Sequence, residues 1–185
     1  MIGIPVAVID ACVLVNFSLC DTLLRLAEAP RIYEPKWSEE ILNETLRTLE
    51  GKLGWPVSLT QYFQSELKNH FAEAWVHGHE PLIPYLKNDQ KDRHVLAAAI
   101  HSNARFVITF NLRHFRPEHL QFWEVSAIHP DGFLSALYRQ RPKLVVEKLR
   151  QQAEDRSRSV SQLIGLLSKS VPGFAKLIRD EWSRS

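Results

Sequence analysis

Acidic and amide side chains stand at places along the chain where metal-dependent chemistry could use them. Asp10 and Asn111 each come at the end of an apolar run of strand length, and Asp92 falls in the first turn of an expected helix. Glu44 belongs to another expected helix and faces inward from it. Carboxylates that converge in one cleft repel each other unless a cation neutralises them. Hard oxygen ligands suit Mg²⁺ or Mn²⁺, which can activate a water and stabilise the leaving oxygen of a phosphodiester, so these residues indicate a metal-dependent nuclease.

Asp10 and Glu44 also have simpler explanations, which stay open at this point. Asp10 can cap the helix that follows it, which is a common role for aspartate. Glu40 and Glu44 are spaced i,i+4 on one side of a helix and repel mildly unless a cation offsets the repulsion. A solvated face near the positive end of the helix dipole explains Glu40, but Glu44 lies too far into the helix for that explanation.

The stretch Asn88–Phe115 organises the rest of the chain, because it reads as a helix that leads into a buried strand. Asp89 is the N-cap candidate of that helix, since its carboxylate can accept a hydrogen bond from a free backbone N–H of the first turn. The run Arg105–Phe110 is dense in β-branched and aromatic residues, which suits a buried strand. Ligands gather at the carboxyl ends of strands in open α/β sheets, so the candidates for one site are Asp92, Thr109 and Asn111.

The other elements up to His129 alternate between strands and helices, which is typical of an α/β fold with a parallel sheet. Further strands are predicted at Pro5–Ile9, Arg31–Pro35, Pro81–Leu86 and Glu124–His129. Helices are predicted at Ala11–Leu19, at Glu39–Leu49 with Ser38 as the N-cap, and at Leu59–Val76.

The chain changes character after His129, where amphipathic helical patterns follow one another. The predicted helices are Asp131–Tyr138, Leu144–Ala153, Val160–Leu167 and Phe174–Trp182. We therefore predict an α/β nuclease domain over residues 1–129 and a helical C-terminal extension over residues 130–185. The pattern of the extension does not discriminate between reading RNA, pairing protomers and docking a partner.

The net charge of +2 hides an uneven distribution along the chain. Residues 1–129 carry 12 Lys/Arg and 15 Asp/Glu, whereas residues 130–185 carry 11 Lys/Arg and 6 Asp/Glu. An acidic body with a basic tail fits a carboxylate site in the body and an anionic partner near the tail. Solvation of surface helices explains the same basic side chains equally well, namely Arg139, Arg141, Lys143, Arg150, Arg156 and Arg158.

Other functional classes find little support in the sequence. Cys12 and Cys20 form no CxxC pair and read as small hydrophobic residues in a reducing compartment. His77 and His79 lack further ligands at a zinc spacing, and no P-loop, GxGxxG or GxSxG motif occurs. The apolar N-terminal stretch contains Asp10 and lacks a basic n-region, and no window is long enough to span a bilayer. We therefore expect a cytoplasmic protein without membrane contact.

Several motifs, taken in their order and spacing, resemble those of PIN domains. They are VIDACVL near the N-terminus, SEEILNETLRTL in a helix, DQKDRHVLAAAI, and VITFNLRHF. The resemblance covers Val6–Phe115. The branch that it suggests includes the VapC-type toxins of bacterial toxin–antitoxin pairs.

Carried over by position, the resemblance implies the metal-binding acids Asp10, Glu44 and Asp92. The T-x-N-x-x-D-F segment of the family matches this chain at Thr109, Asn111 and Phe115. His114 stands where that segment has its acid, and an imidazole cannot replace a carboxylate on Mg²⁺. Asp89 or Asn111 is the candidate substitute for this fourth ligand.

The resemblance also implies a fold and an activity. The fold is a three-layer α/β sandwich around a central parallel sheet, and the activity is cleavage of single-stranded RNA with Mg²⁺ or Mn²⁺. Residues that could position water or hold the RNA backbone are Thr109, Asn111, Arg93, Arg113 and Arg116, although surface solvation explains each arginine equally well. Relatives of this type commonly form homodimers and are inhibited by a small antitoxin protein. Two alternatives stay open: a catalytically weak or inactive PIN-like binding module, which His114 favours, and a DNA-processing nuclease.

Overall fold

Short apolar runs pair side by side in one parallel sheet, in a computed structural model that describes residues 3–182. The strands are β1 (Val6–Ile9), β2 (Glu34–Ser38), β3 (Trp75–Val76), β4 (Phe106–Ile108) and β5 (Ser126–Ile128), in the order β3-β2-β1-β4-β5. Each neighbouring pair runs parallel. The strand β1 lies at the centre, and its residues Ala7, Val8 and Ile9 have no exposed surface, because helices cover both faces of the sheet.

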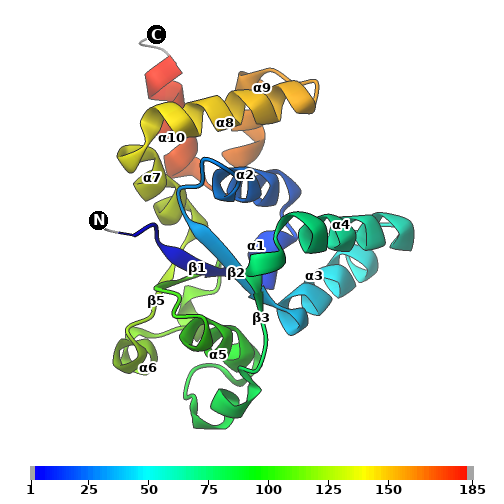
Figure 1. Ribbon diagram of the computed structural model, residues 1–185. Coiled ribbons are helices and arrows are strands. Elements are labelled where there is room, and N and C mark those ends of the chain that lie inside the picture. Colours follow the sequence, from blue (N-terminus) through cyan, green and yellow to red (C-terminus); the bar gives the residue numbers. More distant parts are fainter. Residues whose placement is uncertain (1–2, 183–185) are drawn as a thin grey trace.

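Helices flank the sheet on both faces. Up to β5 they are α1 (Ala11–Leu14), α2 (Phe17–Ala27), α3 (Glu39–Gly51), α4 (Val57–His70), α5 (Arg93–His101) and α6 (Pro117–Leu120). Short 3₁₀ helices lie at Ala72–Ala74, Glu80–Tyr85, Gln90–Asp92, Leu112–His114 and Gln121–Trp123. Figure 1 shows α5 and α6 below the sheet and α2 above it, so the layers are helix, sheet and helix. The predicted α/β sandwich with a central parallel sheet is confirmed.

The C-terminal extension adds a further helical layer beyond α2 (Figure 1). Its helices are α7 (Pro130–Gln140), α8 (Pro142–Asp155), α9 (Val160–Leu167) and α10 (Pro172–Trp182). The hydroxyl of Thr22 in α2 donates to Oε1 of Gln152 in α8 at 2.7 Å, and both side chains are buried. The ring of Phe133 in α7 meets the ring of Tyr33 edge to face at 5.1 Å. The division of the chain at residue 129 stays a prediction, and apolar packing is continuous across it.

The second strand lies three residues later than the predicted Arg31–Pro35, and Pro35 is inside it instead of ending it. The N–H of Glu34 donates to the carbonyl of Pro5 beside β1 at 2.8 Å. Because neighbouring N–H groups of a strand point to opposite sides, the missing N–H of Pro35 faces away from β1. On that side β3 pairs only from Trp37 onward, so the proline leaves no ladder bond broken.

The predicted third strand at Pro81–Leu86 is wrong. That segment forms the 3₁₀ helix Glu80–Tyr85, whose two prolines fix φ and remove backbone donors that a sheet would need. The third strand is Trp75–Val76 instead, which the periodicity had placed at the end of a helix. The ring of Trp75 packs edge to face on Trp37 of β2 at 6.3 Å, a contact between residues that the local pattern cannot reveal.

Two helix boundaries also differ from prediction. The expected helix Ala11–Leu19 is two helices, because Asn16 interrupts it and caps α2 by accepting from the N–H of Leu19 at 3.4 Å. Asp89 caps only the 3₁₀ turn Gln90–Asp92, through the N–H of Lys91 at 3.1 Å, and α5 begins one residue after Asp92. Within residues 3–182, no helix is both long and apolar enough to cross a bilayer.

Candidate active site

The sheet order places the ends of β1 and β4 next to each other at the point where the chain changes direction. From β1 the chain moves to β2 on one side, and β4 then returns to pair on the other side of β1. The N–H of Asp10 donates to the carbonyl of Ile108 at 3.1 Å, so the carboxyl ends of both strands are in register. Crevices at such points are where open α/β sheets bind ligands.

An open cleft of about 500 Å³ lies at this edge. Side chains that we predicted to be catalytic all line it: Asp10, Glu44, Asp92 and Asn111. Other polar groups in its lining come from α3 and the residue after it, namely Arg47, Thr48 and Lys52. The cleft thus combines carboxylates with two exposed cations.

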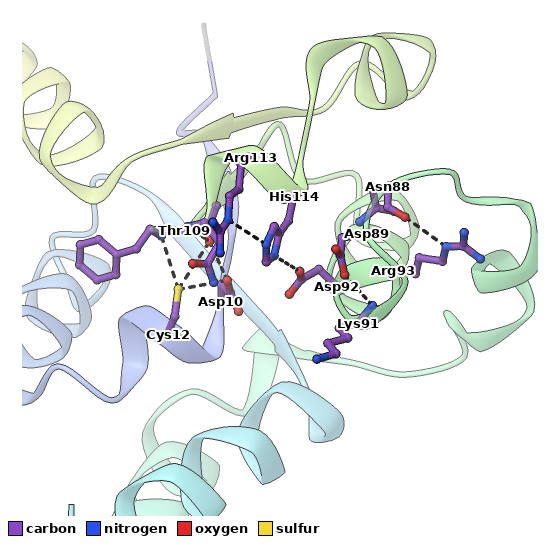
Figure 2. Close-up of polar contacts among 12 residues, drawn as sticks. Asp10, Cys12, Asn88, Asp89, Lys91, Asp92, Arg93, Thr109, Arg113 and His114 are labelled. Carbon is purple, nitrogen blue, oxygen red and sulfur yellow. Dashed lines mark hydrogen bonds and ion pairs between the residues drawn. The ribbon is translucent and has the colours of Figure 1, made fainter. Parts of the chain in front are cut away.

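Two side-chain donors fix the carboxylate of Asp10. Its Oδ2 atom accepts from the hydroxyl of Thr109 at 2.6 Å and from the thiol of Cys12 at 3.1 Å (Figure 2). Asp10 itself is only 3% exposed, so these donors replace part of the hydration that a charged carboxylate loses on burial. The hydroxyl of Thr109 in turn accepts from the N–H of Asn111 at 3.0 Å.

Thr109 therefore occupies a different position from the one expected of an RNA contact. It has no exposed surface, and its hydroxyl is used by Asp10 and Asn111. The side chain offers nothing to a nucleic acid and instead fixes the orientation of Asp10. A contact between Thr109 and RNA stays a prediction, which the burial of this side chain does not favour.

Glu44 lies beside a buried histidine that the sequence did not single out. The Nε2 atom of His94 is 3.4 Å from Glu44, and its Nδ1 atom is 3.7 Å from Glu40. Burial lowers the pKa of His94, but the carboxylates of Glu44 and Glu40 outweigh it, so the pKa is raised above its ordinary value of 6.5. Glu40 and Glu44, which repel each other along α3, thus share a nearby imidazole.

Asp92 meets His114, the residue that departs from the family pattern. The Nδ1 atom of His114 is 2.6 Å from Oδ2 of Asp92, and Nε of Arg113 donates to its Nε2 atom at 3.2 Å (Figure 2). Burial raises the pKa of Asp92 and the hydrogen bond from His114 lowers it, with a net upward shift. Among the described residues, one group of at least three His, Cys, Asp or Glu side chains has all its donor atoms within 4.8 Å: Asp89, Asp92 and His114.

The arginines that we predicted to bind RNA lie in different environments. Nε of Arg93 donates to the carbonyl of Asn88 at 3.3 Å, and Figure 2 shows this side chain beyond Asp92 and pointing away from Asp10. Arg113 is exposed and lies on the Asp10 side of His114 in the same view. Arg116 is exposed and lies 3.9 Å from Glu118. Of these side chains, Arg113 is the best placed to meet a ligand in the cleft.

Sequence reasoning missed Cys12, His94, Arg47 and Lys52. Arg47 follows Glu44 by three residues in the same helix, so helical spacing could have found it. Cys12 and His94 carried no comparable signal, because their roles depend on contacts with residues of other elements or on the local fold of the cleft.

Comparisons with known proteins gave two matches. The PIN domain family matches residues 6–113. Over 136 residues the chain is 34% identical to the protein named Putative ribonuclease VapC50 from Mycobacterium tuberculosis (strain ATCC 25618 / H37Rv). The alignment covers 72% of this chain and 79% of that protein. No solved structure gives a significant match to the chain.

Proposed function

The chain belongs to the PIN domain family, and from that premise we propose that it is a metal-dependent endoribonuclease that cuts single-stranded RNA. The observation that carries this proposal is the cleft itself. Side chains from β1, α3, α5 and β4 regions, which are far apart in sequence, converge there as Asp10, Glu44, Asp92 and Asn111. Their oxygen atoms are the ligands that Mg²⁺ and Mn²⁺ prefer.

The donor set fits a divalent ion held by Asp10, Glu44 and Asp92, with Asp89 next to Asp92 as a further ligand. Such an ion supplies Lewis acidity, an activated water and charge neutralisation at the leaving oxygen. Thr109 and Cys12 fix one oxygen of Asp10 and leave the other for the ligand. The amide of Asn111 is placed to orient the water or a phosphate oxygen.

Cations on two sides of the cleft suit the RNA backbone. Arg47 of α3 and Lys52, the residue after this helix, line the cleft, and both are exposed. Arg113 extends from the opposite segment, after β4. Phosphates held between these side chains would lie across the carboxylates. A single strand has no base pairs to open before it enters such a cleft.

We further propose that the protein is the toxin of a toxin–antitoxin pair, whose small protein antitoxin blocks the cleft. The curated relative bears the name of a VapC ribonuclease, which supports this placement. A homodimer and a cytoplasmic location stay predictions from the sequence.

Cleavage of unstructured RNA should be measured with Mn²⁺, with Mg²⁺ and with EDTA, using wild type, Asp92→Asn and Asp180→Asn. Asp180 is exposed on α10, so its variant is a matched control for the same chemical change. Cuts that need metal, disappear in Asp92→Asn and persist in Asp180→Asn are expected. Equal cutting by all three proteins would rule out the assigned site.

The alternative of an inactive binding module rests on His114, which pairs with Asp92 at 2.6 Å and occupies the acidic position. It predicts RNA binding without turnover in any metal. Competition by single-stranded DNA distinguishes the remaining alternative, because a DNA-processing nuclease would prefer the competitor.

A further inference from the structure

We propose that Asp89, Asp92 and His114 form a mixed oxygen and nitrogen metal site that selects a first-row transition ion over Mg²⁺. This inference rests on the proposed function, because Asp92 also lines the catalytic cleft. The donor atoms of the three side chains all lie within 4.8 Å of one another. Two carboxylates and one imidazole carry enough charge to neutralise a divalent ion.

The main chain holds these three residues together independently of their side chains. The N–H of Asp89 donates to the carbonyl of His114 at 3.3 Å, which joins the segment before α5 to the segment after β4. The N–H of Asp92 donates to the carbonyl of Asp89 at 3.0 Å, so both aspartates belong to one tight turn. Phe115, which follows His114, is 2% exposed and anchors the second segment in the core. The site is therefore built on fixed backbone, which favours metal binding without large rearrangement.

The chemistry of the donors decides which ion they prefer. Mg²⁺ takes oxygen ligands almost exclusively and loses water reluctantly, whereas imidazole nitrogen suits Fe²⁺, Ni²⁺, Cu²⁺ and Zn²⁺. The affinity of such a site rises from Mn²⁺ through Fe²⁺ and Co²⁺ to Cu²⁺. The fit of this site to Mg²⁺ is poor for that reason. His114 therefore does not abolish metal binding at this site but changes which ion the site prefers.

The contacts around His114 turn its Nδ1 atom toward Asp92. Arg113 donates to Nε2, so in the metal-free protein the ring proton is assigned to Nδ1, which faces Asp92. An ion bound between Asp89, Asp92 and Nδ1 would take the place of that proton. The proton moves to Nε2, which then no longer accepts from Arg113, so the neutral ring binds the ion through Nδ1 and Asp92 contacts the ion where it had contacted the ring.

The test is the direct detection of the histidine nitrogen on the metal. Metal-free full-length protein is loaded with Mn²⁺, and electron spin echo spectroscopy measures coupling to a bound imidazole nitrogen. We compare wild type with His114→Asp, which replaces the imidazole ligand by a carboxylate, and with His77→Asp, which changes an exposed histidine outside the cluster. Coupling in wild type and His77→Asp, and its loss in His114→Asp, is the expected result.

Metal preference gives a second readout. The ratio of Co²⁺ to Mg²⁺ affinity, from calorimetric titration, should fall by about tenfold or more in His114→Asp, on the scale that changes around metal sites produce. Nitrogen coupling that persists in His114→Asp, or that is absent from Mn²⁺-loaded wild type, would overturn the proposal. So would a Co²⁺ to Mg²⁺ ratio that His114→Asp leaves unchanged.

Parallel RNA cleavage assays separate this inference from the proposed function. Wild type that cuts RNA but shows no nitrogen coupling would refute the mixed site and leave the nuclease standing. Nitrogen coupling that depends on His114, in a protein that cuts no RNA with any ion, would establish the site and refute the nuclease.

Discussion

The hydroxyl of Thr109 donates a hydrogen bond of 2.6 Å to Oδ2 of Asp10, although the two residues are 99 positions apart in the sequence. Both side chains are buried, so neither can exchange this bond for water. Thr109 thereby connects the end of β4 to the carboxylate at the end of β1. The orientation of the candidate metal ligand depends on the pairing of these two strands.

Replacing Thr109 with valine should lower both the stability of the protein and its affinity for metal. The change removes a buried hydrogen bond to a charged group, which costs about 1.5–3 kcal/mol in the free energy of unfolding. Urea denaturation measures the loss, and metal titration measures the effect on the site. Thr109→Ser keeps the hydroxyl and should recover most of both values. Equal losses in the serine and valine variants would contradict a role for the hydroxyl.

The thiols of Cys12 and Cys20 should resist alkylation in the folded protein at pH 8. Burial, together with the charge of Asp10, raises the pKa of Cys12 to about 12, and burial with the charge of Asp21 raises that of Cys20 to about 12. Because these pKa values lie well above the ordinary thiol pKa of 9.0, both groups stay protonated and unreactive at pH 8. Mass spectrometry after iodoacetamide treatment should find modification only in urea. Fast labelling of Cys12 in native buffer would contradict the burial of its thiol and the raised pKa.

The metal-free protein should lose stability from His94 as the pH rises. The folded pKa of His94 is raised above 6.5, so its protonated form is favoured by folding. Its contribution is complete below pH 6.5 and disappears as the pH passes through the higher folded value. The difference in unfolding free energy between wild type and His94→Gln, measured in EDTA, should therefore shrink from pH 5.5 to pH 9. A difference that grows with pH would contradict a favourable interaction of protonated His94 with Glu40 and Glu44.

Two glycines in the extension should respond to alanine in opposite directions. A Cβ atom at Gly173 would come within 2.8 Å of Oδ2 of Asp131, whose carboxylate accepts from the N–H groups of Gly173 and Phe174. Gly173→Ala should cost about 1–3 kcal/mol, as overpacking does. Gly165 lies in α9 with open space around it, and its alanine variant should gain about 0.5–1 kcal/mol from helix propensity. Thermal unfolding of both variants checks the pair.

Arg47 and Lys52 should contribute to RNA affinity in a salt-dependent way. Each phosphate contact adds about 0.7 to the slope of log affinity against log salt for a single strand. Arg47→Gln and Lys52→Gln should each reduce that slope, whereas Lys169→Gln, an exposed change just beyond α9, should leave it unaltered. Fluorescence anisotropy at several salt concentrations measures it. A slope equal to wild type in both cleft variants would place the RNA elsewhere.

Much of this protein could be predicted from local sequence. The apolar run before Asp10, the cap at Ser38 with its apolar helical face, and the Ala-rich helix after Asp92 each specify an element through neighbours along the chain. Because carboxyl ends of parallel strands meet at one edge, these patterns were enough to bring Asp10, Glu44, Asp92 and Asn111 into one cleft.

Tertiary structure decided what depends on contacts between distant segments. Trp75–Val76 is a strand because it meets β2, although its own periodicity is helical, and Pro35 is tolerated in β2 because its neighbour on one side begins two residues later. Thr109 turned out to be a buried donor to Asp10, and His94 a buried partner of Glu44. The pairing of His114 with Asp92 belongs to the same class. Local sequence determines backbone preference and polarity, whereas the partner of a buried polar group is set by which segments the whole fold packs against it.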